Sequence, residues 1–206
     1  MSKKLIIIGC GGHAKAVTDI AIKCGYDNIG YLDDASSVDN FMGFPVLGKI
    51  NDASKYSSED FVVAIGDAKI RQKLHIEFSQ KGFNIVTLIH PSAVVASDVT
   101  IGDGTVVMAG AVVNPSTKIG KGCIINTCSS VDHDCVIGDF SHISVGAHIA
   151  GTVKIGNNAW IGIGATVSNN IDIVADCLIG AGAVVVKSLL ESGTYIGIPA
   201  KKIKQS

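Results

Sequence analysis

An uninterrupted six-residue period is the feature that most restricts the fold of this chain. Every sixth residue from Ile89 to Val185 is Ile or Val, which gives seventeen consecutive matches. Only 30 of the 102 residues from 89 to 190 are of these two types, so chance does not explain the pattern. A fixed period of this kind indicates a repeat architecture, in which each unit packs against its neighbours along the chain.

Small residues recur with the same period, four places after most of these aliphatics. They are Ala93, Thr105, Ala111, Thr117, Cys123, Ser129, Cys135, Ser141, Ala147, Ala159, Ala165, Cys177 and Ala183. A parallel β-solenoid accounts for both patterns, because a large side chain points inward from each short strand while a small one fits a tight corner. Three six-residue segments make one triangular coil, so residues 18 apart are expected to stack.

The residue before each inward aliphatic is expected to point outward, and stacking arranges these residues in three columns. The first column is Val106, Ile124, His142, Trp160 and Leu178; the second is Val94, Val112, Ser130, His148, Thr166 and Val184; the third is Thr100, Lys118, Val136, Lys154, Asp172 and Leu190. Exposed apolar columns are a liability on a monomer. We therefore expect another subunit to cover the first column, which contains the single tryptophan of the chain.

Residues 1–88 follow a different pattern, in which strands and helices alternate. Strands are predicted at residues 3–9, 28–34, 60–67 and 83–89, and helices at 12–24 and 69–82. Alternation of this kind predicts a small parallel sheet with nucleotide-binding character. The predicted fold is therefore an α/β half-Rossmann-like domain at 1–88, followed by a parallel β-helix with a C-terminal tail at 89–206.

The first loop of this domain is rich in glycine and reads G-x-G-x-x-A from Gly9 to Ala14. Asp33 and Asp34 follow the second predicted strand, where a ribose-binding acid belongs in a dinucleotide fold. A domain of this size is half of such a fold, so we expect one nucleotide, with its phosphate at the start of the helix. The alternative is that the glycines only permit a tight turn.

Charge and hydropathy exclude two classes of partner. The chain has 17 basic and 18 acidic residues and no Lys/Arg-rich run, so it lacks the electrostatic footprint of a nucleic-acid partner. No apolar stretch approaches the length of a membrane span, and the first apolar run is too short for a signal peptide.

The six cysteines are scattered and include no C-x-x-C pair, which favours reduced thiols in a cytoplasm. Cys123 and Cys135 occupy inward positions, whereas His133 points outward. These three residues cannot converge on an ion, so we expect no metal site.

An acid–histidine–acid triplet, Asp132-His133-Asp134, lies within the repeat. The phase of the repeat turns His133 outward, in a column that continues one coil later with Gly151. A residue without a side chain is expected to leave a slot there, with the Gly151 N–H available to an oxyanion. An imidazole has a suitable pKa to act as a base; the alternative is a solvated surface histidine.

Several segments together carry a family resemblance: "GxGGHAK" at the N-terminus, "YLDD", "AIGDAKIRQKL", "SSVDHDCVIGDFSHISVGAHIAG" and "YIGIPAKKI". Over essentially its full length the chain resembles the sialic-acid O-acetyltransferase and bacillosamine N-acetyltransferase family. Its members are hexapeptide-repeat enzymes with a left-handed solenoid. They acetylate sugars, many of them nucleotide-linked amino sugars, with acetyl-CoA. Related enzymes are trimers with active sites between subunits, so the resemblance implies a homotrimer.

The resemblance also implies roles for individual solenoid residues. It assigns the general base to His133 and the orienting carboxylate to Asp134, where the bacillosamine enzymes carry Glu; Asp132 is an alternative partner. It places His142 and Ile163 at acetyl-CoA, with packing at a subunit interface as the alternative for His142.

In this family the small domain holds the nucleotide sugar. The resemblance therefore implies substrate contacts from Gly11, Gly12, His13, Asp33, Asp34, Gly66, Asp67 and Arg71, the last of these with a phosphate. His148 receives no role.

The leading hypothesis from the sequence is an acetyl-CoA-dependent N-acetyltransferase that acts on a nucleotide-linked amino sugar, with a histidine base and direct attack on the thioester. O-acetylation of sialic acid or another sugar hydroxyl is the nearest alternative, and a non-catalytic sugar-binding solenoid is the second. The sugar, the nucleotide and the acetylated position stay open at this point.

Overall fold

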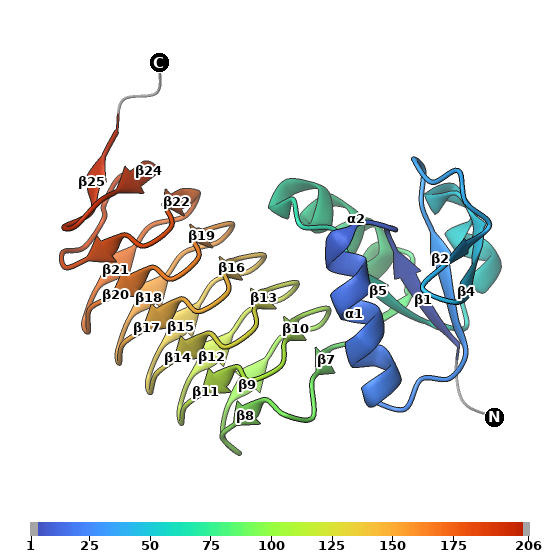
Figure 1. Cartoon of the computed structure of the whole chain (residues 1–206), viewed down its shortest axis with the longest axis horizontal. Coiled ribbons are helices and arrows are strands. Elements are labelled where there is room, and N and C mark those ends of the chain that lie inside the picture. The colour runs from blue at the N-terminus through green and yellow to red at the C-terminus, as the bar shows by residue number, and fades with distance from the viewer. Residues whose placement is uncertain (1–3, 204–206) are drawn as a thin grey trace. The chain divides into compact units, whose positions relative to one another are not determined.

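The structure is a computed structural model that describes residues 4–203. It divides the chain into two compact units, Met1–Pro91 and Ser92–Ser206, the first mixed α/β and the second a stack of coils (Figure 1). The first three and last three residues of the expected domains lie outside the described residues.

The first unit is built on a six-stranded sheet. In spatial order its strands are β3 (Asn40–Phe41), β4 (Phe44–Gly48), β2 (Ile29–Leu32), β1 (Leu5–Ile8), β5 (Asp60–Val63) and β6 (Asn84–Ile85). β1 pairs in parallel with β2 and β5, as expected for consecutive β-α units. Its LIII sequence is fully buried, which is typical of a central parallel strand covered on both faces.

The helices of this unit are α1 (Gly12–Lys23) and α2 (Ala68–Gln80), close to the predicted ranges. The antiparallel pair β3–β4 and the 3-10 helix η1 (Ile50–Tyr56) were not predicted. The last predicted strand is shorter than expected, because only β6 joins the sheet and β7 (Leu88–Ile89) follows separately along the chain. Short edge strands such as β3 carry too few residues for a clear period.

The second unit is a left-handed parallel β-helix, whose strands are mostly two residues long and stack into three sheets (Figure 1). The first sheet contains β10 (Val106–Val107), β13 (Ile124–Ile125), β16 (His142–Ile143), β19 (Trp160–Ile161), β22 (Cys177–Ile179), β24 (Gly193–Ile196) and the antiparallel β25 (Lys201–Lys202). The second contains β8 (Val94–Val95), β11 (Val112–Val113), β14 (Ser130–Val131), β17 (His148–Ile149), β20 (Thr166–Val167) and β23 (Val184–Val185). The third contains β9 (Thr100–Ile101), β12 (Lys118–Ile119), β15 (Val136–Ile137), β18 (Lys154–Ile155) and β21 (Asp172–Ile173).

Strand pairing confirms the predicted stacking of residues 18 apart. Ser130 pairs with His148, and His142 with Trp160. The inward aliphatics from Val107 to Val185 are at most 4% exposed and form one core with the small corner residues. Ile89 is an exception that the repeat predicted wrongly, because it is 37% exposed.

The corners of the coils share one backbone conformation. Every sixth residue from Gly104 to Gly182 has a positive φ between 54° and 72°. Glycine occupies six of these fourteen positions, and the others include Asp134, Asn158, Asn170 and Asp176. Gly, Asn and Asp are the residues that enter the left-handed region most readily, so the corners are a third periodic feature of the sequence.

Candidate active site

The Asp132-His133-Asp134 triplet forms the corner between β14 and β15. His133 and Asp134 are the two central residues of the turn, and Asp134 has a φ of +58°. Because the chain turns here from the second sheet into the third, the two neighbouring side chains do not diverge as they would on a strand. The His133 Nδ1 atom lies 2.8 Å from Asp134 Oδ2, and both side chains are more than half exposed, at 56% and 58%.

This contact determines the electronic state of the imidazole. The hydrogen bond to Asp134, together with the nearby charge of Asp132, raises the pKa of His133 above its usual value. A carboxylate on Nδ1 holds that nitrogen protonated, so that Nε2 is the basic atom. This is the contact that an orienting carboxylate would make with a general base.

The residue above the imidazole is close enough to touch it. A Cβ atom added to Gly151 would lie 2.6 Å from His133 Nε2 and 2.7 Å from its Cε1. The ring therefore occupies space that any side chain at position 151 would fill. The Gly151 N–H has no hydrogen-bond partner among the described residues.

Side chains of the preceding coil form hydrogen bonds with the same corner. The buried hydroxyl of Thr117 donates to the Asp132 carbonyl at 2.7 Å and accepts from the Cys135 N–H at 3.2 Å. The Asp132 carboxylate accepts from Asn114 Nδ2 at 2.7 Å and from the His133 N–H at 2.8 Å, which lowers the pKa of Asp132. Sequence reasoning found Asp132 but missed Asn114 and Thr117. Their distance of 18 residues from Asp132 and Cys135 was the available signal.

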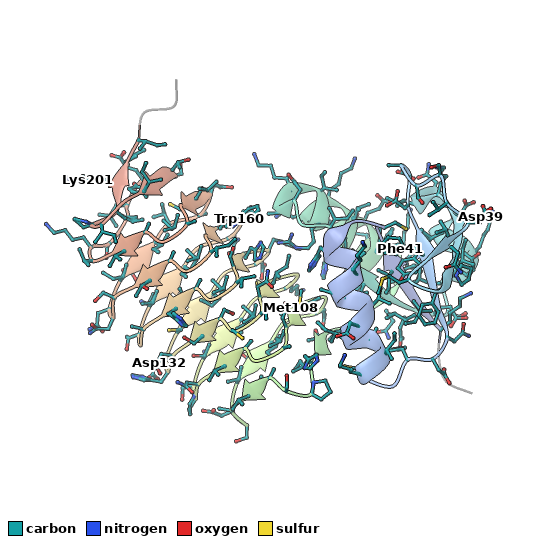
Figure 2. The ribbon with its side chains drawn as sticks, viewed as in Figure 1. Asp39, Phe41, Met108, Asp132, Trp160 and Lys201 are labelled. Atoms are coloured by element: carbon teal, nitrogen blue, oxygen red, sulfur yellow. The ribbon has the colours of Figure 1, made fainter. Side chains whose placement is uncertain are left out.

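His142 and Ile163 lie elsewhere on the solenoid. His142 is on β16 of the first sheet, with its ring 4.9 Å from the Trp160 ring and its Nε2 2.9 Å from Asn126 Nδ2. Figure 2 shows Trp160 and Asp132 at different edges of the solenoid. Within one chain, the structure brings His133, Asp134 and Gly151 together and leaves His142 and Ile163 on another face. Asn126 is a further polar residue of that face that sequence reasoning missed.

In the first unit, the glycine-rich loop borders a hollow of about 460 Å³. Its lining includes Cys10, Gly11, Asp33, Ser36 and Phe41. Gly11 precedes α1, and a Cβ on Gly11 or Gly12 would meet no atom within 4 Å, so the start of the helix is open to a ligand. Backbone N–H groups in this position suit a phosphate.

Asp33 and Asp34, the two predicted ribose-binding acids, accept hydrogen bonds from the backbone. Asp33 accepts from the N–H groups of Cys10, Ala35 and Ser36, each at 2.7 Å. Asp34 accepts from the Ile50 N–H at 2.9 Å. These carboxylates therefore shape the loops around the hollow.

Asp67 caps α2 by accepting from the Ile70 N–H at 2.9 Å. Arg71 is 1% exposed and donates from Nη1 to the carbonyls of Ile65 and Gly66, at 2.9 and 2.8 Å. Through these two hydrogen bonds its guanidinium stabilises the loop that follows β5. Burial, with the charge of Arg71, lowers the pKa of His13 to about 4, so that this imidazole is neutral near pH 7.

The described residues contain no group of three or more metal-ligating side chains. Cys123 and Cys135 are fully buried inside the solenoid, opposite to the outward His133. No helix within residues 4–203 is both long enough and apolar enough to cross a bilayer.

Comparison with known proteins identifies several related chains. The family model of the PglD N-terminal domain matches residues 4–78. The UDP-N-acetylbacillosamine N-acetyltransferase of Bacillus subtilis is 34% identical over 115 residues, which cover 52% of each protein. The chain thus spans about half the length of this relative, and it spans 21% of a curated mimivirus relative.

Two solved structures match over nearly their full length. The acetyltransferase domain of PglB from Neisseria gonorrhoeae is 39% identical, with a TM-score of 0.94 and coverage of 98% of this chain and 100% of that one. PerB from Caulobacter crescentus, solved with CoA and GDP-perosamine, is 40% identical, with a TM-score of 0.92 and coverage of 98% and 97%. The protein therefore belongs to the family of hexapeptide-repeat sugar acetyltransferases that includes UDP-N-acetylbacillosamine N-acetyltransferase.

Proposed function

We propose that this protein transfers the acetyl group of acetyl-CoA to the amino group of a nucleotide-linked amino sugar. The observation that carries the proposal is the His133–Asp134 pair on an outward corner, with Gly151 against the ring. Similar proteins support the substrate class: the PglB domain has been solved with acetyl-CoA, and PerB with CoA and GDP-perosamine.

The chemistry needs one base and no covalent enzyme intermediate. The free amine attacks the thioester carbonyl, and His133 Nε2 takes the proton that the nitrogen loses. The tetrahedral oxyanion then collapses, the C–S bond breaks, and CoA leaves as a thiolate that takes the proton from His133 Nε2, which restores the base. Asp134 stabilises the imidazolium through Nδ1, and the unpartnered Gly151 N–H is our candidate donor to the oxyanion.

We further propose that the enzyme works as a homotrimer. Trp160 and Leu178 of the first sheet are each 43% exposed, and Ile163 at the neighbouring corner is 61% exposed. A contiguous apolar face of this kind favours a subunit contact. If a neighbouring subunit brings this face to the His133 corner, then His142 and Ile163 contact acetyl-CoA there.

We assign the nucleotide of the acceptor to the hollow beside Gly11, where the carboxylate of Asp33 holds the lining loops through the N–H groups of Cys10, Ala35 and Ser36. Gly12, His13, Asp34, Gly66, Asp67 and Arg71 stay predicted substrate contacts. None of the six cysteines, all within residues 4–203, forms a disulfide, which supports a cytoplasmic location where thiols stay reduced.

A thiol-release assay with acetyl-CoA and UDP-, GDP- and dTDP-linked amino sugars tests the function. We expect CoA release with at least one of these amines, and a loss of about 10²- to 10⁴-fold in kcat for His133→Ala with the fold retained. Release only with hydroxyl acceptors would show an O-acetyltransferase instead. No release with any acceptor would favour a non-catalytic solenoid.

A further inference from the structure

A second hollow lies on the solenoid, on the outer face of the second sheet. It has a volume of about 270 Å³. Its polar lining comes from Asn114, Ser130, Asp132, His148 and Thr166, which belong to successive coils. None of these residues except Asp132 has a place in the mechanism above.

Hydrogen bonds hold most of these groups in fixed orientations. Ser130 Oγ lies 2.8 Å from His148 Nδ1, and Asn114 Nδ2 donates to Asp132 Oδ1 at 2.7 Å. His148 Nε2 and the Thr166 hydroxyl have no partner among the described residues. The hollow therefore offers a ring nitrogen, a hydroxyl and a carboxylate edge that are already positioned for a polar ligand.

The hollow reaches the catalytic corner. Ala150 lines it, and the next residue is Gly151, against which His133 Nε2 lies. Asp132 lines it from the other side and is bonded to the His133 N–H. A ligand in the hollow would thus carry its nearest substituent to the atom that must accept a proton.

Size and charge select the ligand. Pockets for drug-sized molecules begin at roughly 300 Å³, so this hollow suits one sugar ring rather than a whole nucleotide sugar. The Asp132 carboxylate repels phosphate, which disfavours the diphosphate of either substrate. The same charge attracts an amino group that arrives as an ammonium.

We propose that this hollow receives the pyranose ring of the acceptor, and that the Ser130–His148 pair and Thr166 read its ring hydroxyls while Asp132 faces its amino group. This inference rests on the proposed function and adds the residues that select the sugar.

The test compares Ser130→Ala, His148→Ala, His148→Gln and Thr166→Val with the wild-type chain, using the nucleotide-linked amino sugar that the wild type acetylates fastest. Each lost hydrogen bond should raise the KM for the acceptor about 3- to 10-fold. The KM for acetyl-CoA should stay constant, and His148→Gln, which keeps a polar group near the Nε2 position, should recover part of the loss. Lys154→Ala, on the third sheet, is the matched control and should change nothing.

Two results would overturn the inference. One is an active enzyme in which the His148 and Thr166 variants keep the wild-type acceptor KM; the other is an equal rise in the KM for acetyl-CoA. If the wild type releases no CoA with any acceptor, the proposed function fails first. Calorimetric titration of the same sugars into wild type and His148→Ala then tests separately whether the hollow binds the sugar. Weaker binding to the variant supports this role of the hollow, and equal or absent binding rejects it.

Discussion

At the scale of single residues, the catalytic corner depends on one unusual backbone conformation. Asp134 has a positive φ, and only for that reason does its carboxylate reach the ring of the preceding residue. Asn and Asp tolerate this conformation better than other residues with side chains. Asp134 therefore serves the turn and the imidazole at once, and a substitution that tests its charge must keep the turn.

Asp134→Asn meets that requirement and should change the pH dependence of the reaction. In the wild type the raised pKa of His133 means that the active, unprotonated base appears only above the usual value of about 6.5. Removing the carboxylate removes the largest cause of this rise, so the acidic limb of kcat/KM should move to lower pH and the plateau should fall. The measurement is kcat/KM for the acceptor across the pH range. The substrate amine titrates in the same way with both enzymes, so it cannot cause a difference between their pH profiles. An acidic limb of kcat/KM at the same pH in both enzymes would contradict the assignment of His133 as the base.

At the scale of the coil, each corner is supported by the coil beneath it. Thr117 links the Asp132 carbonyl and the Cys135 N–H, and Thr105 links the Gly120 carbonyl and the Cys123 N–H in the same way. The two threonines make equivalent contacts, but only Thr117 lies under the catalytic triplet. They form a natural pair of test and control.

Thr117→Val and Thr105→Val should each lower the free energy of unfolding by about 1–3 kcal/mol, because each leaves buried backbone groups without a partner. Only Thr117→Val should also lower kcat, by about tenfold or more, since displacement of the corner misplaces the base. Denaturant unfolding and steady-state kinetics measure the two effects. Equal losses of activity in both variants would show that stability alone, and not the position of the corner, controls the rate.

Much of the structure of the coils was predictable from the sequence. The six-residue period predicted the inward core, the stacking of residues 18 apart and the outward direction of His133. The period failed at Ile89, because the end of a stack has no coil to bury it. It also could not show the His133–Asp134 contact, which depends on a left-handed turn that a side chain of ordinary size adopts. Arg71 shows the same limit in the first unit, since burial of a charged residue against loop carbonyls has no signature in a single sequence.

At the scale of the whole molecule, the proposed active site is incomplete in one chain. The base lies at the corner between the second and third sheets, whereas His142 and Ile163 lie on and beside the first sheet. Trp160 and Leu178 also lie on the first sheet, and their apolar side chains are exposed. Assembly would bury this surface and bring the missing groups to the base.

Trp160→Glu and Leu178→Glu should therefore convert trimers into monomers and abolish turnover, because burial of an unpaired carboxylate at an apolar contact is costly. Light scattering after gel filtration measures the mass, and circular dichroism checks the fold. Lys154→Glu, on the third sheet, is the control and should leave a trimer. A wild type that runs as a monodisperse monomer, or a Glu variant that stays trimeric, would reject this face as the contact.

The repeat of left-handed corners has a consequence for how such a protein can change. Fourteen corners share nearly the same φ, and one carries a histidine followed by an acid that holds it. Strands in neighbouring coils lie about 4.8 Å apart, so the height of the base along the solenoid is set by the number of coils below it. Gain or loss of one whole coil below the coil of Asn114 and Thr117 would move the base relative to the N-terminal end of the stack by that step and leave the contacts of these two residues with the triplet corner intact. In evolution, the reach between base and substrate can thus be adjusted in units of 18 residues without rebuilding the catalytic corner.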